Sequence, residues 1–222
     1  GEAIAYERRL IPLDGFAQTL DRMAASSIAQ ATSGLSPATL FMAISDWAIH
    51  MASSPGKQLQ LSAKAARKSA RLLDYAVRKA RDPDAAPAIE PLPQDHRFVD
   101  QAWQKPPFNL IAQSFLLNQQ WWHAATSGID GVSRHHEDIV NFVARQFLDY
   151  FSPSNFIATN PVLLKRIADT GGQCLADGAA HWLEDMQRQF RGEPPVGTEA
   201  FKPGETVATA KGKVVFRNQL VE

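Results

Sequence analysis

The stretch KQLQLSAKAARKSARLLDYAVRKAR, residues 57–81, has the most regular pattern in this sequence and decides the fold class. Apolar residues recur in it at alternating steps of four and three, which places them along one side of a helix. These positions are Leu59, Ala63, Ala66, Ala70, Leu73, Val77 and Ala80. We therefore expect a long helix that uses this heptad seam as its apolar face, within a mainly α fold.

The remaining sides of this expected helix are basic. They carry the candidate contact residues Lys64, Arg67, Lys68, Arg71, Arg78 and Lys79, with Asp74 as an acidic residue among them. A basic side of this kind is most often solvated and lies opposite the apolar seam, and we favour that interpretation. The alternative is a face that binds an anionic surface or an acidic partner.

The composition of the whole chain excludes several classes of protein. The 222 residues include 23 Lys and Arg against 23 Asp and Glu, and this balance argues against a nucleic-acid-binding protein. The single cysteine cannot form an internal disulfide, which is typical of a cytoplasmic protein. No stretch reaches the roughly 18 uncharged apolar residues of a membrane span, so we expect no transmembrane segment.

Helical periodicity covers most of the chain outside this stretch. It predicts further helices over about 13–33, 37–53, 108–127, 133–151 and 161–190. The proline-rich residues 82–95 interrupt the pattern and predict a semi-rigid linker. The last residues change to a period of two, which predicts a β-hairpin with strands near 206–210 and 213–217.

Cys174 is a candidate nucleophile, because Gly172-Gln173-Cys174 matches the first half of a G-x-C-x-G nucleophile elbow. However, Ala176 replaces the second glycine, and residues 161–170 have helical rather than strand periodicity. We interpret Cys174 as a small structural residue, with a thiol enzyme as the alternative.

A second candidate site is the run of His135, His136 and Glu137. Adjacent residues on a helix point about 100° apart, so the two histidines cannot chelate one metal as an i, i+4 pair would. Glu137 is better explained as a first-turn residue whose charge complements the helix dipole. The sequence therefore predicts no catalytic, cofactor-binding or metal-binding residue.

Short motifs occur in order along the chain. The main block consists of 100–103 (DQAW), 107–108 (PF), 114–117 (SFLL), 152–156 (SPSNF), 159–161 (TNP), 170–172 (TGG), 183–185 (LED), 200–201 (AF) and 212–218 (GKVVFRN). In combination, this block resembles the N-terminal region of class I polyhydroxyalkanoate synthases, also called poly-beta-hydroxybutyrate polymerases. A second block, made of 34–37 (GLSP), 46–47 (DW), His50 and 54–57 (SPGK), resembles the short extra N-terminal segment of some members.

The resemblance implies an acyltransferase that joins 3-hydroxyacyl groups from coenzyme A thioesters into a polyester. In the family, this reaction belongs to a C-terminal α/β-hydrolase-like domain with a Cys nucleophile, a His and an Asp, and no residue of this chain takes those roles. We expect an accessory helical segment with the basic amphipathic helix at 1–81, the linker at 82–95, and a helical N-terminal domain at 96–203. Residues 204–222 would then form a hairpin that joins the sheet of the missing catalytic domain, and the chain alone would be inactive.

The resemblance also implies a supporting role in assembly, granule association and stabilisation of the catalytic domain. The expected partners are that domain, further synthase copies, and the polyester granule surface or its associated proteins, in the cytoplasm. One alternative is a free-standing helical protein that binds granules or a partner and has no enzymatic parent. Nucleic-acid binding through residues 57–81 is a further alternative, which the neutral total disfavours.

Overall fold

A computed structural model of the chain describes residues 13–31, 36–210 and 212. This part is mainly helical and contains no β-strand, so the mainly α class predicted from the sequence is confirmed for it. In chain order the elements are α2 (Leu13–Ala31), α3 (Pro37–Ala52), α4 (Pro55–Arg81), η1 (Gln101–Gln104), α5 (Phe108–Ala125), α6 (Arg134–Tyr150), η2 (Pro153–Asn155), α7 (Pro161–Asp169) and α8 (Gln173–Arg191).

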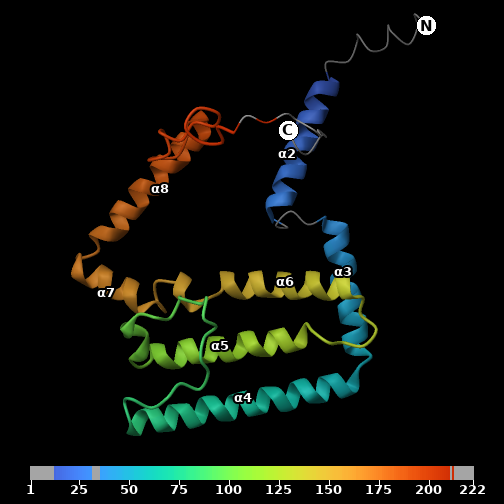
Figure 1. The fold of residues 1–222 in the computed structure, drawn as a ribbon, viewed down its shortest axis with the longest axis vertical. Helices are drawn as coiled ribbons and strands as arrows, with labels where there is room; N and C mark the ends of the chain where they lie inside the picture. Colours follow the sequence, from blue (N-terminus) through green and yellow to red (C-terminus); the bar gives the residue numbers. More distant parts are fainter. Residues whose placement is uncertain (1–12, 32–35, 211, 213–222) are drawn as a thin grey trace, which may run out of the picture. The chain divides into compact units, whose positions relative to one another are not determined.

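The chain forms two compact units, Gly1–Pro161 and Val162–Glu222. In the first unit, α4, α5 and α6 lie side by side with α5 in the middle, and each runs opposite to its neighbour (Figure 1). Helix α3 contacts both α4 and α6, and the short 3-10 helices η1 and η2 contact α5. Helix α5 is therefore the central element of this unit.

Helices of the first unit begin where the sequence supplies a suitable residue. Pro37 and Pro55 stand in the first turn of α3 and α4, where a missing N–H costs no hydrogen bond. Ser133 caps α6, because its hydroxyl accepts a hydrogen bond from the His136 N–H at 3.2 Å. Ser36 precedes α3 in the same way, but its side chain makes no cap hydrogen bond.

The core of the first unit is built largely from aromatic residues around α5. Phe98 packs edge-to-face on Trp103 and on Phe115, with ring centroids 4.8 and 5.8 Å apart. Trp103 is only 2% exposed, and burying a side chain of this size stabilises the fold by about 3 kcal/mol. A second cluster joins α3 to α6 through Ala43, Ile139 and Val140. These clusters hold the helices of the unit together.

The proline-rich residues 82–95 contain no helix, but they are held against α4 and α5. Ala88 is buried in a cluster with Tyr75 of α4 and Leu117 of α5. The Gln113 side chain of α5 accepts a hydrogen bond from the Ile89 N–H at 2.8 Å and donates one to the Ile89 carbonyl at 3.1 Å. The segment is therefore anchored at its centre.

The boundary between the two compact units lies after Pro161. The division of the chain at a linker over 82–95 stays a prediction from the sequence. Prolines prevent a helix in this segment, as expected. They do not prevent burial, and the apolar residues between them fill space beside α5.

In the second unit, α7 and α8 are separate helices, so the single helix predicted over about 161–190 is wrong. Gly171 and Gly172 adopt positive φ angles of +56° and +87° and break the helical path between them. Glycine adopts this left-handed conformation without the steric cost that other residues incur. Helix α8 ends in the same way at Gly192, with φ +67°.

The region of the predicted hairpin shows no strand in its described part. Residues 206–210 form a turn and a bend, with one isolated bridge between Pro203 and Val207. The Thr206 hydroxyl donates to the Ala200 carbonyl at 2.6 Å and accepts from the Lys202 N–H at 2.8 Å, which closes a local loop. A lone hairpin is marginal in water, so a local loop of this kind competes with it. The second predicted strand, 213–217, lies outside the described residues.

Candidate functional site

The six candidate cations on α4 fall into two groups. Lys68, Arg71, Arg78 and Lys79 each form hydrogen bonds with neighbouring elements or with the segment that follows α4. Lys64 and Arg67 make no hydrogen bond or ion pair with the residues that the structure describes, and Arg67 is exposed. Only these two of the six therefore remain available to an anionic surface.

Lys68 turns towards α5 and not towards solvent. Its side chain is buried, and its ammonium group donates a hydrogen bond to the Gln120 side-chain oxygen. Burial lowers the pKa of Lys68 below its ordinary value, and the positive charges of Arg71 and Lys64 lower it further. A lysine can bury its methylene chain in this way while the charged end keeps a polar partner.

Arg71, Arg78 and Lys79 hold the residues that follow α4. They donate hydrogen bonds to the backbone carbonyls of Ala88, Ala86 and Pro83 respectively. Arg78 also forms an ion pair with Asp74 at 2.8 Å on the same helix. These cations therefore have a structural role, because they pair carbonyl groups of a segment whose prolines prevent regular structure.

The heptad seam of α4, which the sequence predicts as its apolar face, faces away from α5 and is exposed. Leu59, Leu73 and Val77 are 72%, 67% and 50% exposed, and the alanines between them are exposed as well. The buried residues of α4 are Leu61, Lys68 and Tyr75. Leu61 and Tyr75 bury more apolar surface than the small alanines of the seam can, which explains the orientation.

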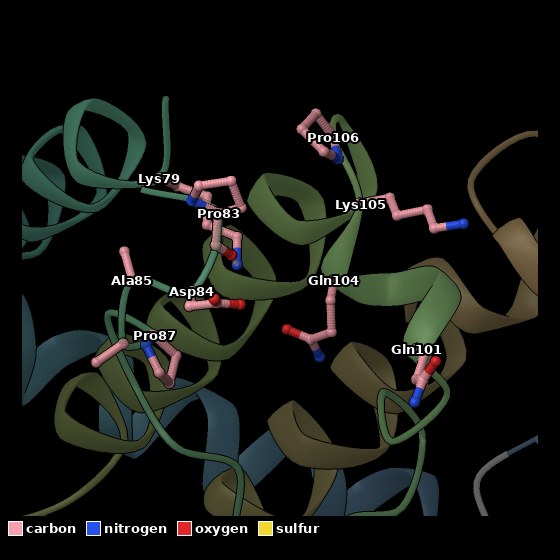
Figure 2. Close-up of a pocket in the computed structure, with 10 residues that line it drawn as sticks. Lys79, Pro83, Asp84, Ala85, Pro87, Gln101, Gln104, Lys105 and Pro106 are labelled. Carbon is pink, nitrogen blue, oxygen red and sulfur yellow. Dashed lines mark hydrogen bonds between the residues drawn. The ribbon is translucent and has the colours of Figure 1, made fainter. Parts of the chain in front are cut away.

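One pocket, of about 660 Å³, lies beside the end of α4. Figure 2 shows its two walls, with Lys79, Pro83 and Pro87 on one side and Gln101 and Gln104 on the other. The Lys79 ammonium group already donates to the Pro83 carbonyl. The pocket is lined by prolines, alanines and two glutamine amides, together with the charged residues Lys79, Asp84 and Lys105, and its lining has no Ser, Cys or His side chain.

A larger pocket, of about 920 Å³, lies between residues 89–97 and helices α5 and α6. Arg97 is its central charge. The guanidinium group donates to both oxygens of Asp95, at 2.8 and 2.7 Å, and to Asp149 of α6 at 2.8 Å. The guanidinium carbon, Arg97 Cζ, also lies 5.1 Å from the centre of the Phe115 ring. Arg97 therefore ties the segment before η1 to α5 and α6.

The charges of this pocket stabilise one another. The hydrogen bonds that Arg97 donates to Asp95 lower the pKa of Asp95 below its ordinary value of 3.8, and the same bonds raise the pKa of Arg97. Because the pKa of Asp95 is lower in the folded state, this carboxylate adds stability above pH 3.8. That contribution is lost as the pH falls through the folded-state value. An arginine paired in this way offers little free charge to a ligand.

Asp46, His50 and His136 form a polar cluster between α3 and α6. The Asp46 carboxylate lies 2.7 Å from His136 Nδ1 and 3.0 Å from His50 Nδ1. The hydrogen bond with His136 is the main cause of a lowered pKa for Asp46. The sequence offered a signal for the Asp46–His50 pair in its i, i+4 spacing, but no signal for its link to His136.

Cys174 is the second residue of α8 and follows helix α7 and the glycine turn. Its position on a helix agrees with the interpretation from the sequence. The thiol is half-buried, and the Cys174 N–H donates weakly to the Thr170 hydroxyl at 3.4 Å. No imidazole is hydrogen-bonded to it among the described residues. A nucleophile elbow, which requires a strand before the cysteine, is not formed here.

The described part of the chain has neither a metal-binding cluster nor a membrane-spanning helix. It contains no group of His, Cys, Asp or Glu side chains arranged to hold a metal ion. None of its helices combines the length and apolar content that crossing a membrane requires. Surfaces that remain open to a partner in this part include the outward seam of α4, the cations Lys64 and Arg67, and exposed apolar residues of α6 and α8.

Comparison with known families gives two matches. Residues 94–222 match the family described as poly-beta-hydroxybutyrate polymerase (PhaC) N-terminus. Residues 15–57 match the family described as poly-beta-hydroxybutyrate polymerase N terminal. No solved structure matches the chain significantly.

Individual curated proteins are also similar to this chain. The poly(3-hydroxyalkanoate) polymerase of Methylorubrum extorquens is 34% identical over 172 residues, which cover 76% of this chain and 28% of that protein. The poly(3-hydroxyalkanoate) polymerase subunits PhaC of Rhizobium etli and Cupriavidus necator are each 32% identical, and the matches cover 60% of this chain and 22% of each protein. The chain therefore spans about a quarter of the length of these relatives.

Proposed function

Because this chain belongs to the poly-beta-hydroxybutyrate polymerase N-terminus family, we propose that it is the non-catalytic N-terminal region of a polyester synthase. The membership confirms the resemblance that the sequence motifs indicate. The observation that carries the proposal is the family match over residues 94–222, which is more than half of the chain.

The parent reaction is polymerisation of 3-hydroxyacyl-CoA. Each cycle forms an ester bond between the hydroxyl of one unit and the acyl carbon of another, breaks the thioester, and releases coenzyme A as a thiol. Such acyl transfer requires an activated nucleophile with an adjacent base. Cys174 on its helix lacks that arrangement, so the chemistry belongs to a catalytic domain of the α/β-hydrolase type that this chain would support.

The role of the chain is to assist assembly, granule association and the stability of that catalytic domain. Support comes from exposed apolar residues in both units, which a folded partner would cover. The last turn of α6 exposes Phe147 and Tyr150, and the exposed Phe151 follows it. Helix α8 exposes Trp182 and Phe190, the latter by 85%. Lys64 and Arg67 are the cations suited to an anionic granule surface in the cytoplasm. The hairpin near 204–222 would form only when the sheet of the catalytic domain is present.

A chimeric enzyme tests this proposal. The chain replaces the aligned N-terminal segment of the Methylorubrum extorquens polymerase, and CoA release from 3-hydroxybutyryl-CoA is measured together with polyester accumulation. We expect the chimera to recover most of the activity that deletion of the segment removes. A helical domain of equal length and unrelated sequence is the matched control and should not restore activity.

The chain alone provides the second arm of the test. We expect no CoA release from the purified 222-residue protein, and no change on Cys174→Ala. Release that Cys174→Ala abolishes would show that the chain is itself an enzyme and would overturn the non-catalytic assignment. A chimera no more active than the deletion variant would overturn the supporting role.

A further inference from the structure

Helix α4 has two apolar faces, and only one of them is covered within the described part of the chain. Leu61 and Tyr75 pack towards α5, whereas the seam is exposed on the opposite side of the helix. The seam runs from Leu59 to Ala80, a length of about 30 Å at 1.5 Å per residue. A continuous stripe of this length, with Leu59, Leu73 and Val77 along it, is typical of a surface that meets another helix.

The residues beside the seam differ on its two sides. One side carries Arg67 and Asp74, which are opposite charges separated by two helical turns. The other side carries the small residues Ser62, Ser69 and Ala76. A partner helix can therefore approach closely on the second side, while charge determines its direction and register on the first.

We propose that the seam of α4 pairs antiparallel with the same seam of a second copy of this chain. A two-fold pair requires a surface that is complementary to itself. Heptad geometry places Ala70 opposite Leu73 of the second copy, and Ala66 opposite Val77. Leu73 and Val77 then each face an alanine, so the two helices approach closely without a clash, while Leu59 lies beyond the paired length because its opposite position falls after the end of α4 at Arg81.

The charges beside the seam favour this antiparallel register over shifted registers and over a parallel pair. In this register Arg67 lies beside Asp74 of the second copy, and two-fold symmetry repeats the pair. A shift of one heptad brings the two Arg67 side chains together in one direction and the two Asp74 side chains together in the other, and both are repulsive. A parallel pair places Arg67 beside the serines and forms no ion pair. The pairing therefore has one favoured register and direction.

Asp74 can take part in this contact while keeping its existing partner. Its side chain is 65% exposed and accepts one hydrogen bond from Arg78 of the same helix at 2.8 Å. A carboxylate has further lone pairs that can accept from a second guanidinium group. The proposal deepens the assembly role proposed above and rests on that role, because it names the surface and the partner.

The test measures self-association of the purified full chain by sedimentation equilibrium. We expect a species of twice the 24.4 kDa mass of one chain that dissociates on dilution. Arg67→Glu and Asp74→Arg should each weaken association by about tenfold or more, because two ion pairs become repulsive. The combined variant R67E/D74R exchanges the charges and should restore association.

Three further variants separate the seam from general effects. Leu73→Glu places a charge in the seam and should abolish association, whereas Val99→Glu at a similarly exposed site before η1 should leave it unchanged. Arg78→Gln removes the existing partner of Asp74 and should also have no effect. Circular dichroism confirms that each variant keeps its helices.

A chain that stays monomeric at every concentration, or a combined variant that does not recover, would overturn the proposal. If the chain is a monomer and its seam is still protected from solvent, another part of the same chain covers the seam. That result would also contradict pairing with a second copy. The measurement requires no polymerase activity. A negative sedimentation result therefore leaves the proposed supporting role to be tested by the chimera. A negative result with the chimera likewise leaves the sedimentation result unaffected.

Discussion

Gly131 shows how closely the loop before α6 approaches α3. Its φ angle is +93°, and a Cβ atom added to it would lie 2.3 Å from His50 Cδ2. The His50 ring cannot easily move away, because its Nδ1 lies 2.9 Å from the Asp46 carbonyl and 3.0 Å from the Asp46 carboxylate. Gly128 in the same loop also has a positive φ, +64°, but the nearest atom to its added Cβ is Lys57 Nζ at 3.8 Å.

We predict that Gly131→Ala destabilises the protein by about 3 kcal/mol and Gly128→Ala by about 1 kcal/mol. Both changes force alanine into the left-handed region, but only the first adds a clash. Urea unfolding of the two variants measures the difference. If both variants lose the same free energy of unfolding, the His50 ring moves aside without an energetic cost. In that case the double variant Gly131→Ala/His50→Ala would be no more stable than expected from the two single changes.

The residues next to Gly131 show what local sequence predicts at this scale. The spacing from Ser133 to Glu137 predicted the first turn of a helix, and α6 begins there with Ser133 as its cap. Glu137 accepts a hydrogen bond from the Gly128 N–H at 2.7 Å, which a sequence pattern does not reveal. The bond between His136 and Asp46 is equally hidden, since 90 residues separate the two.

At the scale of elements, α4 shows a difference between predicting a helix and predicting its orientation. The heptad pattern predicted the helix over 57–81, and the structure has α4 from Pro55 to Arg81. The pattern did not predict which side faces α5, because it counts apolar positions without weighing their size. Two large side chains, Leu61 and Tyr75, together with the stem of Lys68, bury more surface than a row of alanines.

The anchored segment 82–95 yields a prediction at the same scale. Gln113→Ala removes both hydrogen bonds to Ile89 and should destabilise the protein by about 2 kcal/mol, because two backbone groups lose their partner. It should also make the segment more sensitive to proteinase K. The exposed Gln104→Ala is the matched control and should change neither property.

If digestion of wild type already occurs within 82–95 as fast as in the Gln113→Ala variant, the segment is a free linker. That outcome would favour the interpretation from composition over the contacts that the structure shows.

At the scale of the whole molecule, the two units differ in how much of their surface is buried. Helix α5 in the first unit buries residues along its whole length, from Asn109 to Ala125. Helix α8 in the second unit has no buried residue, although Leu175, Trp182 and Phe190 are apolar. Local stability follows the number of buried apolar contacts, so the second unit should open more readily.

Hydrogen exchange measured by mass spectrometry tests this difference. We predict that peptides from α5 exchange by global unfolding, at least about a hundredfold more slowly than peptides from α8. In the chimera, exchange in α8 should slow if the catalytic domain covers it. Equal protection of α5 and α8 in the isolated chain would contradict the prediction and indicate that α8 is already covered.

The sequence by itself determined most of the helices of the first unit and the family. Periodicity, prolines and serine caps locate helices, because these signals act within a few residues, and the ordered motifs identify the polymerase N-terminus family. Only the tertiary structure decided which face of α4 is buried, where the two units divide, and which of the six cations remain free. Those outcomes depend on total buried area and on pairings between residues far apart in the chain, such as Arg97 with Asp149 and Gln113 with Ile89.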